Sequence, residues 1–273
     1  MTQPPLIDEA QPLPRKSIWK REIVSKKKWR KICVALLCLS FLVWFFQPHL
    51  IGMFVLRDLI KDPIVTNTPQ PLKDKSVAQA AGAPIMRFGY EFSVPWSNAT
   101  VRDANSTAVL LSSNGAGFIF FNPANGVDTV GVIKQSATSR YSPQSVFGES
   151  TLRSNYDFLA DTLNVTPGQL SFLNSRKREA RNMTLLVMKS TQIGNSDGSI
   201  YSIDLPSFRG FQFGDPASGK AVTVELFDSG DRRLRFLFSS KDHPVTQPQI
   251  NLILQSLHAA PSSSPQATAP QSS

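Results

Sequence analysis

Residues 221–239 read "AVTVELFDSGDRRLRFLFS", and this stretch decides the fold class. Two runs of alternating apolar residues flank the short polar turn "SGD". Strict alternation is typical of a β-strand with one face in a core, and Ser, Gly and Asp are turn-forming residues. The second run would place Leu234, Phe236 and Phe238 on one face, and Arg233, Arg235 and Leu237 on the other. The stretch therefore predicts a long antiparallel hairpin with one buried face.

Further strands are indicated on both sides of this hairpin. In the run that begins at Phe88, Tyr90, Phe92 and Val94 alternate with smaller or polar residues until Pro95 stops the pattern. Residues 128–136 fit either a strand or a helix. Other short apolar runs bounded by turn residues predict strands at 107–113, 117–122, 184–190, 199–205 and 210–214.

Three helices are predicted from periodicity and from start signals. The first follows Ser154, where apolar residues recur at helical spacing. The second begins at Thr166 with a capping box to Gln169 and runs into 175–181. The third covers 246–257, with a capping box of Thr246 and Gln249. Its buried stripe would be Ile250, Ile253, Leu254 and Leu257.

The order of strands, helix pair, strands and helix predicts an α+β domain with a mainly antiparallel sheet flanked by helices. The opening "Y-x-F-x-V-P" (90–95), the central helical insert, the hairpin and the closing "I-N-x-I-L-x-S-L" (250–257) resemble the PsbP-like α/β/α sandwich family. The resemblance covers most of 86–258 and is detailed only at the two ends. It implies a non-enzymatic binding domain in a photosynthetic or cell-envelope context, and it implies no catalytic residues.

A transmembrane signal-anchor helix is predicted at 32–56, a run without charged residues. The formal net charge is +9, and residues 1–31 hold nine Lys/Arg against three Asp/Glu, so +6 of it precedes the run. By the positive-inside rule the N-terminus is cytoplasmic and the C-terminal domain is extracytoplasmic, at the inner or plasma membrane. The basic tail either sets this topology alone or also contacts anionic lipid.

The predicted organisation has five parts. They are a basic cytoplasmic tail (1–31), the transmembrane helix (32–56), a linker (57–85), the extracytoplasmic α+β domain (86–258) and a low-complexity, disordered tail (259–273). Because the positive charge is concentrated before the apolar run, composition gives no reason to expect a nucleic acid partner.

One stretch resembles a nucleotide site. In "FGDPASGKAV" (213–222), Gly214, Gly219 and Lys220 match a P-loop until Ala221, where Ser or Thr is needed. The residues after it alternate like a strand, whereas a P-loop needs a helix there, so we interpret the stretch as a turn between strands. The three histidines, His49, His243 and His258, lack metal-ligand spacing. We therefore expect no catalytic, cofactor-binding or metal site.

One candidate docking site remains. Arg176, Lys177, Arg178 and Arg181 form a basic cluster that fits an acidic partner or lipid headgroups, or else is a solvated helix face. The sequence thus favours a membrane-anchored extracytoplasmic binding domain with a protein or cell-envelope partner. The alternatives are an anchored extracytoplasmic hydrolase whose site is not visible in the sequence, and an assembly subunit that acts through its anchor.

Overall fold

The computed structural model describes residues 63–105, 108–113, 118–123, 128–135, 142–171, 174–192, 197–239 and 245–260. All of them belong to one compact unit, Gly52–Ser273. The predicted basic tail, transmembrane helix and most of the C-terminal tail lie outside the described residues. In the part of the chain that is described, no helix is both long and apolar enough to cross a membrane.

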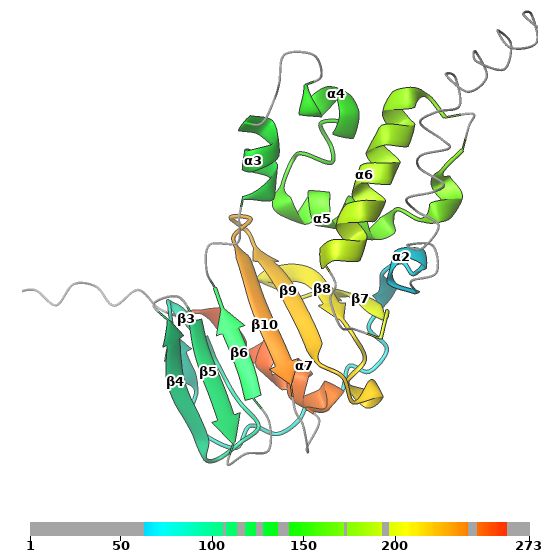
Figure 1. Cartoon of the computed structure of the whole chain (residues 1–273). Coiled ribbons are helices and arrows are strands. Elements are labelled where there is room, and N and C mark those ends of the chain that lie inside the picture. Colours follow the sequence, from blue (N-terminus) through cyan, green and yellow to red (C-terminus); the bar gives the residue numbers. More distant parts are fainter. Residues whose placement is uncertain are drawn as a thin grey trace, which may run out of the picture. The chain divides into compact units, whose positions relative to one another are not determined.

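An eight-stranded sheet is the centre of this unit (Figure 1). Its strands, in spatial order, are β1 (Gln70–Pro71), β7 (Ile200–Asp204), β8 (Phe208–Phe213), β9 (Val222–Asp228), β10 (Arg233–Ser239), β6 (Phe118–Asn122), β5 (Ala108–Ser113) and β4 (Ala99–Asn105). All neighbours are antiparallel except β1 and β7, which are parallel. The predicted α+β class with a mainly antiparallel sheet is confirmed.

The β9–β10 hairpin forms as predicted and lies in the middle of the sheet. Leu234 is paired with Leu226 and Phe236 with Val224. The predicted inward face of β10, which carries Leu234, Phe236 and Phe238, is buried. Its opposite face carries Arg233 and Arg235, which pair with the buried Glu225 of β9. One strand pair therefore supplies the apolar core on one side and a charged cluster on the other.

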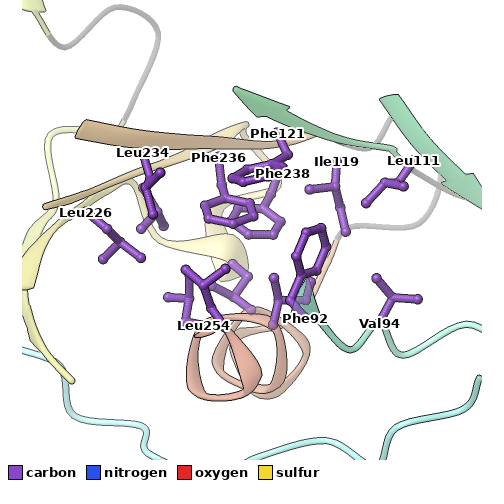
Figure 2. Close-up of a cluster of buried hydrophobic side chains, with 14 of the residues drawn as sticks. Phe92, Val94, Leu111, Ile119, Phe121, Leu226, Leu234, Phe236, Phe238 and Leu254 are labelled. Carbon is purple, nitrogen blue, oxygen red and sulfur yellow. The ribbon is translucent and has the colours of Figure 1, made fainter. Parts of the chain in front are cut away.

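The main core lies between this sheet and a cover made of a small sheet and one helix. The small sheet contains β2 (Ile85–Arg87), β3 (Tyr90–Phe92) and β11 (His258–Ala259), and the helix is α7 (Gln247–Ser256). Phe92 packs against Phe121 and Phe236 with ring centroids 5.3 and 5.7 Å apart (Figure 2). The predicted capping box and buried stripe of α7 are both confirmed.

The N-terminal part of this cover differs from the prediction. The expected single strand from Phe88 is a β2–β3 hairpin that turns at Phe88 and Gly89, with φ of 53° and 77°. Tyr90, Phe92 and Val94 are nevertheless buried, as their alternation predicts. The domain also continues past residue 258, because β11 pairs with β3 and the Ala260 amide donates to the Gly89 carbonyl over 2.8 Å.

The other helices gather beside the part of the sheet formed by β7–β10 (Figure 1). They are α2 (Pro63–Thr66), α3 (Thr129–Gln135), α4 (Pro143–Phe147), α5 (Asn155–Asn164) and α6 (Arg176–Gln192). Leu159 and Leu163 of α5 pack with Phe211 of β8 and Phe227 of β9. The start of α5 after Ser154 is confirmed, since the Ser154 hydroxyl accepts the Asp157 amide. The ambiguous segment 128–136 is resolved as α3.

Two predictions in this layer are wrong. The helix expected from Thr166 is only a single 3-10 turn, η1 (Pro167–Gln169), and Thr166 makes no side-chain cap. The strand expected at 184–190 is instead the second half of α6. Asn182, Leu185, Leu186 and Lys189 are buried at spacings of three, four and seven, which is the spacing of one helix face. The apolar run "TLLV" (184–187) is too short to reveal this helix face, because two of the buried residues, Asn182 and Lys189, are polar and lie outside the run.

The segment expected as a linker packs against the domain over much of its length. We call residues 63–78 the strap. Val65 of α2 is fully buried, β1 pairs with the edge of β7, and the Ala78 amide donates to the Pro248 carbonyl over 2.9 Å. The strap therefore crosses from the helical layer, past the sheet edge, to the start of α7.

Candidate functional site

A cleft of about 970 Å³ opens where four segments meet. They are the strap, the start of β7, the turn after β8 and the start of α7. Its volume is in the range of small-molecule and peptide sites. The lining residues include Asn67, Gln70, Leu72, Lys73, Ser199, Tyr201, Asp215, Ala217, Val245 and Gln247.

A second, smaller cavity of about 260 Å³ continues along the same strand. It is lined by Pro71, Leu72 and Lys75 of the strap, by residues 202–205, and by Asn251, Leu254 and Gln255 of α7. Leu72 lines both cavities. Together they form a groove that follows the outer edge of β7 from Ser199 to Leu205, and the strap lies in it.

A chain of three amides lies behind this groove. Gln212 and Gln247 bond reciprocally at 2.7 and 3.0 Å, and Gln247 also donates to Asn251 Oδ1 over 2.9 Å. Asn251 Nδ2 then donates to the Asp74 and Ser76 carbonyls over 2.9 and 2.7 Å. Asn251 is buried, so its two N–H groups are fully used in holding the strap backbone. Asn251 is a binding group that the sequence reading missed, because its partners are about 175 residues away.

The P-loop-like stretch lies at one end of the cleft. The Asp215 carboxylate accepts the Ala217 amide at the start of η2 (Pro216–Ser218), and Gly219 is left-handed with φ of 71°. β8 enters this turn and β9 leaves it, so the interpretation as a turn between strands is confirmed. Tyr201 Oη lies 3.4 Å from Asp215 Oδ2, and burial raises the pKa of the Tyr201 hydroxyl. The hydroxyl is therefore protonated at neutral pH, and it donates its hydrogen to Asp215.

A buried lysine anchors the first part of the strap. Lys189 of α6 has no exposed surface, and its Nζ donates to the carbonyls of Val65, Asn67 and Val165 at 3.2, 2.6 and 2.9 Å. Three acceptors match the three donors of an ammonium group. Burial lowers the pKa of Lys189 to about 8. No local pattern marks this role, because a lysine at the end of an apolar run normally reaches solvent.

The predicted docking cluster is divided by the fold. Arg176, Lys177 and Arg178 are exposed in the first turn of α6. Arg181 instead faces the helical layer, where Nη2 pairs with Asp161 over 2.8 Å and Nε donates to the Phe147 carbonyl over 3.2 Å. The structure thus brings three of the four residues together at the surface and uses the fourth to join α6 to α4 and α5.

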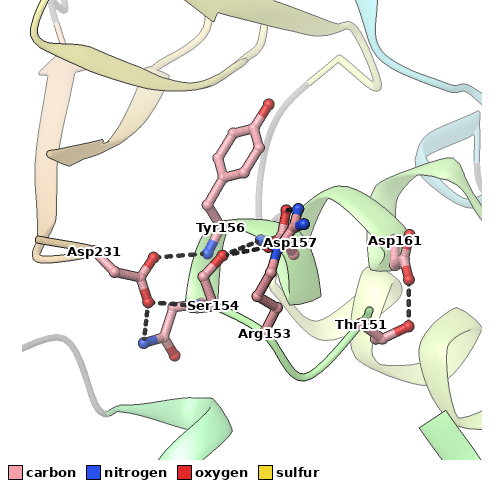
Figure 3. A network of polar contacts seen from close by, with 8 residues as sticks. Thr151, Arg153, Ser154, Tyr156, Asp157, Asp161 and Asp231 are labelled. Atoms are coloured by element: carbon pink, nitrogen blue, oxygen red, sulfur yellow. Dashed lines mark hydrogen bonds and ion pairs between the residues drawn. The ribbon is translucent and has the colours of Figure 1, made fainter. Parts of the chain in front are cut away.

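A second polar cleft, of about 530 Å³, lies at the start of α5. Asp231, in the turn between β9 and β10, accepts the backbone amides of Asn155 and Tyr156 at 2.6 and 3.1 Å (Figure 3). Asn155 Nδ2 donates to both Asp231 and Asp128, over 2.9 and 3.1 Å. These contacts engage both carboxylates and the N-terminus of α5, so the network joins the β9–β10 hairpin to the helices.

Reactive clusters are not found in the described ranges. Within them, no group of three or more His, Cys, Asp or Glu side chains could hold a metal ion. His258 is exposed, with Nε2 at 3.5 Å from Glu91 Oε2, while His49 and His243 lie outside the described residues. The chemistry that the groove offers is therefore hydrogen bonding, apolar contact and charge pairing.

Comparisons with known proteins give no assignment. No family model matches the chain, and neither the curated proteins nor the solved structures contain a significant match. The resemblance to the PsbP-like family therefore stays a prediction, and the candidate site depends on geometry alone.

Proposed function

We propose that this chain is a single-pass membrane protein whose C-terminal α+β domain is an extracytoplasmic binding module. The observation that supports it most directly is the groove along β7. It combines a ligand-sized volume with a lining of both polar and apolar residues, the hydroxyl of Tyr201 and a buried amide, Asn251, that binds main chain. Groups of this kind hold a ligand without transforming it, so the proposal has no enzymatic step. Its partner is a protein or another component of the cell envelope.

Photo-crosslinking in intact membranes tests this proposal. A photoreactive side chain would replace Ala217, which is exposed and lines the larger cleft. The matched control replaces Thr184, which is exposed on α6 and lines neither groove cavity. We expect a discrete crosslinked product from position 217 alone. The same product from both positions, or none from position 217, would contradict the proposal.

The exposed residues Arg176, Lys177 and Arg178 are a second contact surface in this proposal. Three cations in one helical turn attract an acidic protein surface or anionic headgroups. Such attraction weakens as salt is added. Replacing the three with glutamine is expected to reduce partner capture at low salt without changing the crosslink from position 217, because the two surfaces are separate.

A further inference from the structure

The strap itself shows what the groove recognises. β1 has two residues and pairs with a five-residue strand, so only Tyr201 and Ser202 of β7 have strap partners in register. Pro71 also lacks an amide hydrogen and cannot donate to the ladder. The cavities on both sides of this short contact leave the rest of the β7 edge open. The strap is thus a minimal occupant of a longer site.

The site binds main chain as well as side chains. Asn251 donates to the carbonyls of Asp74 and Ser76, which are two residues apart in a part of the strap where the Ser76 amide also donates to the Asp74 carboxylate over 2.9 Å. The Ser202 hydroxyl donates to the Gln70 carbonyl over 3.4 Å. All three contacts go to main-chain carbonyls and therefore require a polypeptide but no particular strap side chain.

Side-chain selectivity comes from one apolar and two charged positions. Leu72 contacts both cavities, between β7 and α7. Lys73 lines the larger cavity together with Asp215, and Lys75 lines the smaller one together with Asp204. Each cavity thus has one carboxylate opposite the strap, Asp215 or Asp204, and one strap lysine, while Asp74 of the strap adds a second carboxylate to the larger cavity.

We propose that strap residues 70–76 occupy, in cis, a site for an extended partner peptide that adds to the edge of β7. The partner carries an apolar residue in the position of Leu72 and a basic residue in the position of Lys75. Addition of a strand to an exposed sheet edge is a common mode of peptide binding. The inference rests on the proposed binding function. Lys189 keeps Val65 and Asn67 in place while the later part of the strap exchanges.

The test uses the full chain in detergent micelles and a labelled peptide of residues 67–77, "NTPQPLKDKSV". Leu72→Asp places a carboxylate between the apolar walls and should release the strap. Val77→Asp is the matched control, since Val77 is exposed and lines neither cavity. By fluorescence anisotropy we expect the L72D chain to bind the peptide about tenfold more tightly than the V77D chain.

A charge exchange then identifies the register. In the L72D background, Asp204→Lys should reverse the preference, so that a peptide with glutamate in place of Lys75 binds better than the original. Asp204 is exposed, so this change spares the core. Equal binding by L72D and V77D, or a preference that D204K does not alter, would overturn the inference. Strap-exchanged dimers of L72D would also overturn it, because they assign the groove to a second copy.

Hydrogen exchange measured on the wild-type chain gives a test that does not depend on whether the variants fold. Excess peptide should accelerate exchange of the strap amides at 72–76, and unchanged exchange would count against strap displacement.

Failure of the inference is distinguishable from failure of the proposed function. A crosslink from position 217 without peptide binding leaves a binding module with another ligand, whereas the loss of both removes the module as well.

Discussion

At the scale of the residue, two side chains connect distant segments of the fold. Lys189 joins α6 to the strap and to the connection after α5, through three backbone carbonyls. Asn155 joins α5 to α3 and to the β9–β10 turn. Each spends all the hydrogen-bonding capacity of its side-chain nitrogen on these contacts, and neither is marked by a local sequence pattern.

The stability of the protein is expected to rise with pH where Lys189 titrates. Its pKa is lowered from 10.5 to about 8 in the folded chain. Between these values the unfolded chain binds the proton and the folded chain releases it, so unfolding becomes less favourable as pH rises. The gain relative to Lys189→Met should be up to about 3 kcal/mol. Denaturant titrations of both chains at pH 7 and pH 10 measure it.

At pH 7 the same substitution removes three hydrogen bonds and leaves three carbonyls without their donor. We expect K189M to lose about 2 kcal/mol of unfolding free energy there, after relief of the buried charge. Parallel stability profiles of the wild type and K189M across pH 8 to 10 would show that Lys189 does not titrate in this window.

Asn155→Asp tests the second junction. The substitution keeps the shape of the side chain. It removes the amide group that donates to Asp128 and Asp231 and places a third carboxylate beside these two. We expect a loss of about 3 kcal/mol at pH 7, because like charges meet and two acceptors lose their partner. Part of it should return at low pH, where the introduced carboxyl binds a proton. Asn164→Asp, at the exposed end of α5, is the control and should cost less than about 1 kcal/mol.

At the scale of the element, the close approach of β8 and β9 depends on a missing side chain. A Cβ at Gly210 would lie within 3.0 Å of three backbone atoms of Glu225 and Leu226. These atoms belong to a paired strand and cannot move without shifting the sheet. Phe211 and Phe213 next to it pack on the helical layer, so a shift there would also disturb the contact with α5.

Gly210→Ala is therefore expected to destabilise the protein by about 3 kcal/mol or more, as overpacking against backbone does. Gly168→Ala is the matched control, because its Cβ would meet only the Thr166 hydroxyl, at 3.8 Å. Thermal unfolding followed by circular dichroism compares the two. If the G210A chain unfolds at the same temperature as the G168A chain, β8 and β9 can move apart to accommodate the added methyl group.

At the scale of the whole molecule, the proposed anchor and the folded unit are close together in sequence. The strap begins at Pro63, so only residues 57–62 separate the predicted transmembrane run from α2. Six residues span at most about 20 Å when fully extended. A domain anchored in this way would stay near the membrane surface, and a partner would have to reach the groove there.

Topology is tested with a reporter enzyme that is active only outside the cytoplasm. The fusion is placed after Ala260, because a fusion at residue 85 would separate the strap from the domain that it crosses. We expect an active reporter. Replacing the nine Lys/Arg of residues 1–31 by glutamine should reduce its activity, since the charge difference that orients the span is lost. An inactive fusion in the unaltered chain would reverse the proposed orientation.

The predictions that succeeded were those that depend on local periodicity. The β9–β10 hairpin and α7 each carry a repeat of two or of about three and a half residues, together with turn or cap residues that mark their ends. The predictions that failed depend on which neighbours cover a segment. In α6 the buried polar residues Asn182 and Lys189 interrupt the apolar stripe of the helix. In the strap, Val65 is buried and Leu72 is half-buried, and both lie against elements more than a hundred residues later in the sequence.

By itself the sequence determined the mainly antiparallel α+β class, the central hairpin, the capped closing helix and the turn nature of "DPASGK", because each follows from side-chain alternation or from backbone chemistry over a few residues. Only the tertiary structure decided that residues 63–78 form a strap, that Lys189 and Asn251 hold it, and that Arg181 leaves the basic cluster. These outcomes depend on desolvated hydrogen bonds between remote segments, and a buried polar group finds its partner only when the chain is packed.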